Sequence, residues 1–228
     1  MSKQILEAKN LFYKWHSKDL FSQQKDRVLW KIDELKIDTN GIILLAGRNG
    51  VGKSTLLRCL LGLMRPTAGE IRWFGEQATP RGKIGYLPEL PVLPPRVKVH
   101  EILTSLLGIR RSEVSSSIAK TGSFESLDIS DLLDRPAQLL SKGQQQKLLL
   151  ALASAGSPRG FVLDEPFSGL DPWARSELAE FLIKLAHDGH FLLISSHDAP
   201  VRMRQHIRET WLIEQQNITV HQGCAIPE

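Results

Sequence analysis

The sequence predicts an α/β fold built on a mostly parallel β-sheet, and three observations support this prediction. Apolar runs at residues 41–46, 161–163 and 191–194 have the length and composition of fully buried strands. Helical patterns separate these runs, and such alternation favours a parallel sheet with helices on its faces. Glycine or polar residues follow each run. Because ligands of open α/β sheets bind at the carboxyl ends of strands, we expect one edge of the sheet to carry the chemistry.

The composition is that of one globular protein. The 228 residues suit a single domain spanning residues 1–228. A net charge of +4 is compatible with a bound nucleotide triphosphate, and it is too small to predict a nucleic acid partner. Cys59 and Cys224 are too few for a disulfide framework, and Cys59 is expected to be a small buried residue. Neither a secretory signal nor an apolar run of about 20 residues is visible, so we expect a cytoplasmic protein.

Helices are expected between and after the buried runs. Residues 54–63 form the first helix, and a second begins at Asp171-Pro172, where Asp171 would cap the helix and Gly189 would end it. Residues 96–140 are Ser-rich and contain no convincing buried strand. We interpret them as a small helical subdomain inserted into the α/β core. The apolar stripe of the second helix is Leu178, Phe181, Leu182 and Leu185.

The first apolar run leads into the pattern G-x-x-x-x-G-K-[ST] at residues 47–54. Glycines allow several backbone N–H groups to converge on phosphate oxygens, and the following helix directs its positive end at the same anion. Lys53 is expected to reach the β- and γ-phosphates, and the Ser54 hydroxyl to ligate Mg²⁺. The pattern therefore predicts a P-loop NTPase core that binds ATP and Mg²⁺. The expected nucleotide contacts are Gly47, Asn49, Gly50, Val51, Gly52, Lys53, Ser54 and Thr55.

The second apolar run ends in two acids, Asp164 and Glu165. Asp164 fits the role of orienting Mg²⁺, directly or through its water shell. Glu165 would then face the γ-phosphate and polarise the attacking water as a general base. Adjacent acids at a strand end also occur in solvated turns, but the phosphate loop upstream favours the functional interpretation.

Residues 140–146 read Leu-Ser-Lys-Gly-Gln-Gln-Gln, which resembles the LSGGQ signature of ABC ATPases. The segment lies shortly before the acidic strand, as in that family, and leads into a helix expected over residues 145–153. In the family this segment acts in trans on the γ-phosphate of ATP held by a second subunit. The alternative is a simple capped helix start. The residues given this role by the resemblance are Ser141, Lys142, Gly143 and Gln144.

Further segments resemble landmarks of the same family in the same order. Residues 168–171 look like the D-loop, which crosses the dimer interface and implies that Asp171 lies beside the nucleotide. His197 looks like the switch histidine that contacts the γ-phosphate. Residues 85–89 resemble the Q-loop, and Glu89 stands where the family usually has glutamine. Its carboxylate is implied to accept a hydrogen bond from a metal-bound water.

The N-terminal strand and residues 71–75 match the antiparallel β-subdomain of the family. In the family an aromatic ring of the N-terminal strand stacks on adenine. The register favours Trp15 for this role, with Tyr13 as the second candidate. The alternative is that both rings only pack against the sheet.

The resemblance extends from about Ile5 to Ile218 and implies the ATP-hydrolysing subunit of an ABC transporter. Lys53, Glu165 and His197 would be catalytic. A second ATP-binding subunit, expected to be identical, would complete the dimer around two Mg-ATP. A separate transmembrane permease chain would hold this peripheral subunit at the inner face of the cell membrane.

Two departures from the family pattern and two alternatives remain. Lys142 replaces the first glycine of the signature, and together with Glu89 it looks more like exporter-type ATPases. The main alternative is a soluble ABC-type ATPase that is not coupled to transport. The second is a regulatory module that binds ATP without turnover, against which the filled positions 165 and 197 argue.

Overall fold

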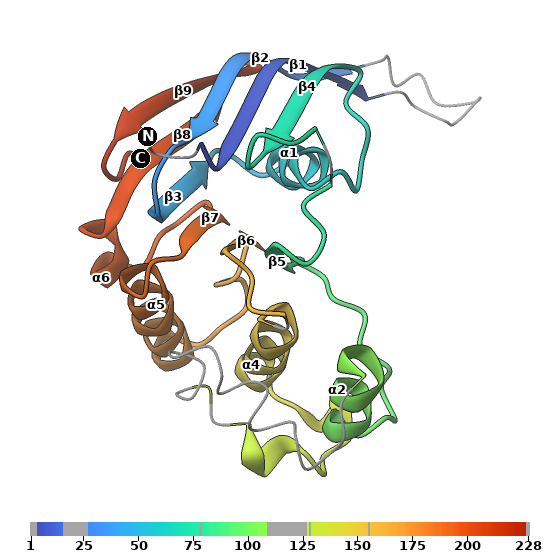
Figure 1. Cartoon of the computed structure of the whole chain (residues 1–228). Coiled ribbons are helices and arrows are strands. Elements are labelled where there is room, and N and C mark those ends of the chain that lie inside the picture. The colour runs from blue at the N-terminus through green and yellow to red at the C-terminus, as the bar shows by residue number, and fades with distance from the viewer. Residues whose placement is uncertain are drawn as a thin grey trace, which may run out of the picture.

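The computed structural model describes residues 4–15, 27–77, 79–108, 127, 129–154 and 156–226. In these residues the strands form two sheets, which Figure 1 shows one above the other. The six-stranded sheet has the order β5 (Ile84–Leu87), β6 (Gly160–Asp164), β7 (Phe191–Ser195), β3 (Gly41–Ala46), β8 (Ile207–Glu214) and β9 (Asn217–Gln222). The three-stranded sheet has the order β2 (Arg27–Ile37), β1 (Leu6–Trp15) and β4 (Ala68–Trp73).

The six-stranded sheet is parallel except at β9, which pairs antiparallel with β8. The three apolar runs that the sequence singled out are β3, β6 and β7, and nearly all their side chains are buried. Such runs suit strands that have neighbours on both faces, because neither face meets water. The predicted α/β fold with a mostly parallel sheet is therefore confirmed. The sequence did not identify β2, β5, β8 or β9 as individual strands.

The N-terminal sheet is antiparallel, as the resemblance implied. The expected strand at residues 71–75 is displaced, because β4 spans Ala68–Trp73. The chain then turns at Phe74 and Gly75, which both have positive φ angles, 54° and 83°. A backbone hydrogen bond from Lys31 on β2 to the carbonyl of Gln216 (2.7 Å) ties this sheet to the β8–β9 hairpin.

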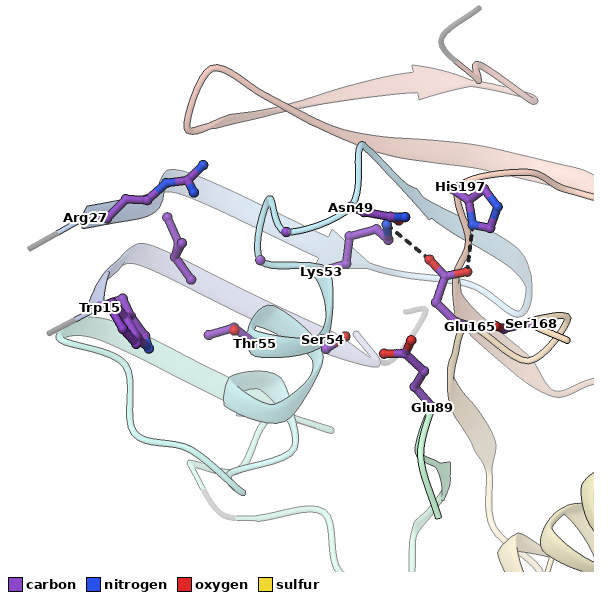
Figure 2. A pocket seen from close by; sticks show the side chains of 13 residues that line it. Trp15, Arg27, Asn49, Lys53, Ser54, Thr55, Glu89, Glu165, Ser168 and His197 are labelled. Atoms are coloured by element: carbon purple, nitrogen blue, oxygen red, sulfur yellow. Dashed lines mark hydrogen bonds and ion pairs between the residues drawn. The ribbon is translucent and has the colours of Figure 1, made fainter. Parts of the chain in front are cut away.

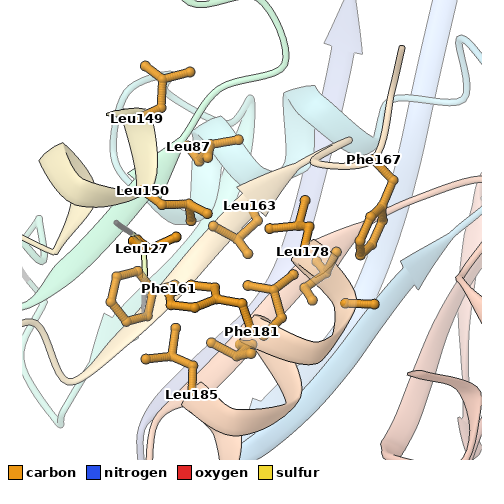
Figure 3. Close-up of a cluster of buried hydrophobic side chains, with 14 of the residues drawn as sticks. Leu87, Leu127, Leu149, Leu150, Phe161, Leu163, Phe167, Leu178, Phe181 and Leu185 are labelled. Atoms are coloured by element: carbon orange, nitrogen blue, oxygen red, sulfur yellow. The ribbon is translucent and has the colours of Figure 1, made fainter. Parts of the chain in front are cut away.

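Helices pack on both faces of the parallel sheet and create two hydrophobic cores. Helix α1 (Lys53–Leu60) lies between the two sheets, where its apolar residues meet side chains of β1, β2 and β3. On the other face, α4 (Lys142–Ala153) and α5 (Pro172–His187) cover β6 and β7. Figure 3 shows this second core, in which Phe161 of β6 lies among leucines of α4 and α5. The two cores fix the loops that follow β3, β6 and β7.

The helix boundaries confirm one prediction and correct two. Helix α5 begins after Asp171, whose carboxylate accepts hydrogen bonds from the N–H groups of Trp173 and Ala174 (3.0 and 2.9 Å). Such a cap contributes about 1 kcal/mol. Helix α1 ends at Leu60 rather than Leu63, because the chain reverses at Gly62, whose φ is 70°. Helix α4 begins at Lys142 rather than residue 145.

The remaining described elements are short. They are α2 (Val99–Leu107), α6 (Val201–Arg204) and the 3₁₀ turns η3 (Ser130–Leu132) and η4 (Ala137–Leu139). Of the predicted insertion at 96–140, residues 109–126 and 128 lie outside the described residues, so its extent stays a prediction. In the part of the chain that is described, no helix combines the length and apolar character needed to cross a bilayer.

Cys59 occupies the position expected of a small buried residue. It lies on α1 within the core between the two sheets. Burial raises the pKa of its thiol to about 12. The side chain is therefore protonated at neutral pH and serves packing rather than chemistry.

Candidate functional site

Strands β6, β7 and β3 lie side by side, so their carboxyl ends meet at one edge of the sheet. A cavity of about 670 Å³ opens at this edge. Figure 2 shows the side chains that point into it. The predicted site residues that line it are Trp15, Asn49, Gly50, Gly52, Lys53, Ser54, Thr55, Glu89, Glu165 and His197. The edge predicted to carry polar chemistry therefore does so.

The phosphate loop needs glycine at two of its positions for steric reasons. Gly47 has a φ of 148°, and a Cβ there would lie 2.9 Å from the carbonyl oxygen of Ile213. Gly52 has a φ of 105°, and a Cβ would press on the indole of Trp30 at 3.1 Å. Side chains at either position would displace the loop from β8 or β2. The phosphate loop is therefore packed closely between β8 and β2.

Lys53 is buried at the start of α1 and holds the phosphate loop closed on itself. Its ammonium donates to the carbonyl oxygens of Gly47 (2.9 Å) and Arg48 (3.5 Å). The same nitrogen lies 3.1 Å from Oε1 of Glu165, which is also buried. Buried ions need such partners, because removal from water costs several kcal/mol each. A nucleotide that takes contacts from Lys53 must therefore replace some of these partners.

Asp164 is completely buried beside the first residues of α1. One of its oxygens, Oδ1, accepts hydrogen bonds from the hydroxyls of Ser54 (3.0 Å) and Ser195 (2.7 Å). The other, Oδ2, is buried and has no hydrogen-bond partner among the described residues. An unpartnered buried carboxylate oxygen beside a hydroxyl is a donor set that suits Mg²⁺ or its water shell. The residues present thus fit the predicted metal.

Glu165 has an unusual backbone conformation that directs its carboxylate into the cavity. Its φ of 47° lies in the left-handed region, which costs a residue with a side chain about 1 kcal/mol. The amide of Glu165 is held by the carbonyl (3.1 Å) and the hydroxyl (2.9 Å) of Ser195. Its Oε2 lies 3.2 Å from Nδ1 of His197. Lys53 and His197 therefore contact the two oxygens of one carboxylate, as the dashed lines in Figure 2 show.

Glu89 adds a carboxylate to the site, and Tyr86 lies close to it on β5. Glu89 follows β5, and in Figure 2 its carboxylate reaches toward Ser54 and Lys53. Burial raises the pKa of the Tyr86 hydroxyl on β5, and the charges of Asp164 and Glu89 add to that rise.

The two candidate aromatic rings have different environments. Tyr13 packs against Trp30, with ring centroids 5.6 Å apart, and does not line the cavity. Trp15 lines the cavity and is 43% exposed. The pairing of β1 with β2 is irregular between Tyr13 and Lys14, so the two rings leave the sheet differently. Trp15 is thus the ring available to a nucleotide base.

The signature segment and Asp171 do not join this cavity. Of the described residues that line it, none belongs to residues 141–144. Ser141 caps α4, where its hydroxyl accepts from the amide of Gln144 (3.3 Å) and its own amide donates to the Gln144 side chain (3.0 Å). Asp171 is occupied in capping α5. Gly47 and Val51 are also outside the lining, although the Gly47 carbonyl accepts from Lys53.

Four residues at the site were given no individual role by the sequence, although Ser168 lies in the segment that resembles the D-loop. Arg27, Leu29 and Ser168 line the cavity, and Ser195 bridges Asp164 to Glu165. Ser195 follows the third apolar run directly, so its place at a strand end was a usable signal. The sequence around Arg27 does not indicate a role at the site, because Arg27 reaches the cavity only through the pairing of β2 with β1, where it lies opposite Trp15.

Known proteins resemble this chain in sequence. A family model described as "ABC transporter" matches residues 31–168. The ATP-binding protein YhaQ of Bacillus subtilis, uncharacterised and assigned to ABC transporters, is 38% identical over 72% of this chain and 56% of its own length. The lipopolysaccharide export ATP-binding protein LptB of Haemophilus influenzae is 31% identical over 85% of this chain and 80% of its own. The match thus spans little more than half of YhaQ and most of LptB.

Solved structures share the fold. A metal-chelate type ABC transporter in an inward-facing conformation has a chain that superposes with a TM-score of 0.76 at 26% identity. That match covers 96% of this chain and 83% of the other. An ATP-binding cassette of an ABC transporter in its ADP conformation gives a TM-score of 0.76 at 22% identity, over 96% and 91% of the two chains. This second likeness concerns the fold alone.

Proposed function

This chain belongs to the ABC transporter family of ATP-binding proteins, and on that premise we propose that it hydrolyses ATP to power a separate permease. One observation carries the proposal. Lys53 and Glu165 line one cavity at the carboxyl ends of the parallel strands β3 and β6, and the buried Asp164 accepts a hydrogen bond from Ser54 of the same lining. An exposed indole, Trp15, lies in the same cavity.

The residues around Lys53 divide the binding of Mg-ATP among them. Lys53 and the backbone amides of the glycine-rich loop bind the β- and γ-phosphates. Ser54 and Asp164 hold Mg²⁺, and Glu89 accepts from its water shell. The ion, when bound, neutralises charge on the phosphate oxygens. Trp15 stacks on adenine at the other end of the cavity.

Glu165 acts as the general base of the reaction. Once the γ-phosphate takes over the ammonium of Lys53, the carboxylate can accept a proton from the attacking water. His197 contacts the same carboxylate (3.2 Å) and helps to fix the γ-phosphate. Loss of the ion pair to Lys53 (3.1 Å) frees Oε1 of the buried carboxylate for the water, while His197 still contacts Oε2.

A second subunit completes each site. The segment of residues 141–144 begins a capped helix at the surface and lies outside its own chain's cavity. A helix start of this kind attracts anions, because the N–H groups of its first turn have no carbonyl partner within the helix and its positive dipole end faces outward. We place it on the γ-phosphate held by an identical partner chain, with Ser168 and Asp171 at the same interface. The permease then holds the dimer at the inner face of the membrane.

A complementation experiment tests this shared site. Ser141→Arg blocks the signature segment and Lys53→Ala removes the phosphate-binding lysine, so each variant alone should release little phosphate. A mixed dimer has one intact site, built from Lys53 of one chain and Ser141 of the other. Half of the dimers in an equal mixture are mixed, so phosphate release should recover to about a quarter of the wild-type rate. Steady-state phosphate release from ATP measures this recovery.

The control is a mixture of Lys53→Ala with Glu165→Gln. Lys53 and Glu165 both act on the nucleotide that their own chain binds. In the mixed dimer one site therefore lacks Lys53 and the other lacks Glu165. No recovery is expected there. Recovery in neither mixture would show that the signature segment does not act on a partner's nucleotide.

Trp15→Ala should weaken ATP binding about tenfold, because loss of base stacking on an aromatic ring costs about 1–3 kcal/mol. Tyr13→Ala should leave ATP affinity within about twofold, since its ring packs on Trp30 outside the cavity. Titration with a fluorescent ATP analogue measures both affinities. The opposite ranking of the two variants would identify Tyr13 as the stacking ring.

A further inference from the structure

The loop that carries His197 is held from outside the cavity. The His197 side chain is 56% exposed, and its ring contacts the carboxylate of Glu165. A half-exposed ring receives little restraint from packing, so its position depends on the backbone that presents it. That backbone follows β7, and the amide of Ser196 donates to the carbonyl of Leu45 on β3 (3.1 Å).

Arg175 of α5 reaches the residue that follows His197. Its Nη2 donates to the backbone carbonyl of Asp198 (2.7 Å) and lies 2.8 Å from Oδ2 of the Asp198 carboxylate. The hydroxyl of Ser196 donates to the same carbonyl (2.8 Å). The peptide unit that follows Asp198 is therefore fixed by a guanidinium and a hydroxyl. The amide of Asp198, in the peptide unit directly after His197, donates to the same Ser196 hydroxyl (3.3 Å).

A second arginine restrains the same loop. Arg204 donates through Nε to the carbonyl of Ala199 (3.2 Å) and through Nη2 to Oδ1 of Asp198 (3.4 Å). The guanidinium of Arg175 also lies 5.8 Å above the ring of Phe167, which belongs to the turn after Glu165. Arg175 thus touches both segments that present the two proposed catalytic side chains.

The charge pair is poorly suited to a role in stability alone. The side chains of Arg175 and Asp198 are 28% and 50% exposed, and ion pairs with this exposure contribute about 0–1 kcal/mol. A guanidinium that holds a carbonyl and a carboxylate together is suited to fixing geometry. Arg175 is also in the first turn of α5, where its amide donates to the carbonyl of Asp171 (2.9 Å).

We propose that Arg175 is a positioning residue for ATP hydrolysis, which holds the 196–198 loop so that the His197 ring stays on Glu165. The inference rests on the function proposed above, in which Glu165 and His197 act on the γ-phosphate. Arg175 itself does not line the nucleotide cavity. The backbone of Arg175 is bonded to Asp171, at the proposed subunit interface, and its side chain to Asp198, beside His197. Arg175 therefore connects that interface to His197.

The test compares Arg175→Met with a matched control, Lys147→Met. Lys147 has the same exposure, 28%, and forms a 2.9 Å ion pair with Glu177 between α4 and α5, away from the His197 loop. Arg175→Met should lower kcat for phosphate release about tenfold or more, with ATP affinity within about twofold, because misplacement of a catalytic group by about 1 Å costs up to about 100-fold. Lys147→Met should retain the wild-type kcat.

Arg175→Lys and a His197→Ala background make the result specific. Lysine keeps a positively charged donor but lacks the rigid planar guanidinium that fixes the direction of both bonds, so its kcat should lie between those of wild type and Arg175→Met. If Arg175 acts through His197, Arg175→Met should cause no further loss in a His197→Ala chain. If Arg175 only stabilised the fold, Arg175→Met would lower kcat in the His197→Ala chain as well.

Three outcomes would overturn the inference. The first is a wild-type kcat for Arg175→Met, or for Arg175→Lys should the methionine variant not fold. The second is an undiminished tenfold loss when Arg175→Met is added to His197→Ala. The third is a wild-type chain that binds ATP without hydrolysing it under these conditions, which would overturn the proposed function as well; the first two leave that function intact.

Discussion

Replacing Glu165 by glutamine is expected to lower the steady-state rate of ATP hydrolysis by at least about 100-fold, because a general base contributes about 10²–10⁴ to the rate. Glutamine has nearly the same shape but cannot accept a proton from water. The backbone that directs this side chain into the cavity, with a φ of 47° and hydrogen bonds to Ser195, does not depend on the carboxylate. The chemical step is therefore lost while the site keeps its form.

ATP binding by Glu165→Gln should be retained or tightened. In the wild-type chain the carboxylate competes with phosphate for the ammonium of Lys53, which lies 3.1 Å away. The amide of glutamine competes less, because it carries no charge. With ATP bound and not hydrolysed, the variant should remain a closed dimer in Mg-ATP. Phosphate release, equilibrium ATP binding and size-exclusion chromatography with light scattering measure the three effects.

Glu177→Gln is the matched control for this variant. Glu177 of α5 also forms an ion pair with a lysine, Lys147 of α4 at 2.9 Å, and it does not line the cavity. Its hydrolysis rate should equal that of the wild type. A Glu165→Gln chain that hydrolyses ATP as fast as the wild type would show that another group is the base.

The parts of the site that lie within one short segment could be predicted from the sequence. The phosphate loop is local, because its glycines, Lys53 and Ser54 follow one buried strand and begin one helix. The two acids, Asp164 and Glu165, could be predicted equally well, since they directly follow the apolar run that forms β6. That these segments meet was predictable too, because parallel strands present their carboxyl ends at the same edge.

Details that depend on pairing between distant segments were not predictable. Ser195 lies next to Asp164 only because β6 and β7 pair in that register. Tyr13 and Trp15 are two residues apart and would face the same side of a regular strand. The irregular pairing of β1 with β2 and the packing of Tyr13 on Trp30 give the two rings different environments.

The start of α4 was an error that a known pattern could have prevented. The helix begins at Lys142, because Ser141 and Gln144 satisfy each other's backbone groups in a capping box. Serine followed three residues later by glutamine is the sequence signature of that cap. The role of these residues in a partner's site is a different matter, and it stays a prediction that the mixing experiment addresses.

Replacing Lys53 by alanine is expected to weaken ATP binding by about 100-fold or more. A buried ammonium that donates to phosphate oxygens is worth about 1.5–3 kcal/mol for each charged hydrogen bond, and two such bonds account for a loss of this size. In the structure this ammonium is already at the loop, bonded to the carbonyl of Gly47 at 2.9 Å. Equilibrium titration with a fluorescent ATP analogue measures the loss.

The same substitution has a second effect, which must be separated from the first. Without Lys53, the carboxylate of Glu165 is buried and lacks its cation, and breaking a buried ion pair in this way costs about 3–5 kcal/mol of stability. A chain that is partly unfolded would also bind ATP weakly. Lys53→Ala alone therefore cannot distinguish loss of a phosphate contact from loss of the fold.

The double variant Lys53→Ala/Glu165→Gln resolves this ambiguity. Glutamine removes the uncompensated charge, so the temperature of unfolding should return most of the way to that of Glu165→Gln. ATP affinity should not recover, because the phosphates still lack the ammonium. Since Glu165→Gln by itself retains ATP binding, a double variant that is as stable as Glu165→Gln and still does not bind assigns the loss to Lys53. If ATP affinity returned together with stability, the lysine would be a structural partner of Glu165 and the phosphate-loop interpretation would be wrong.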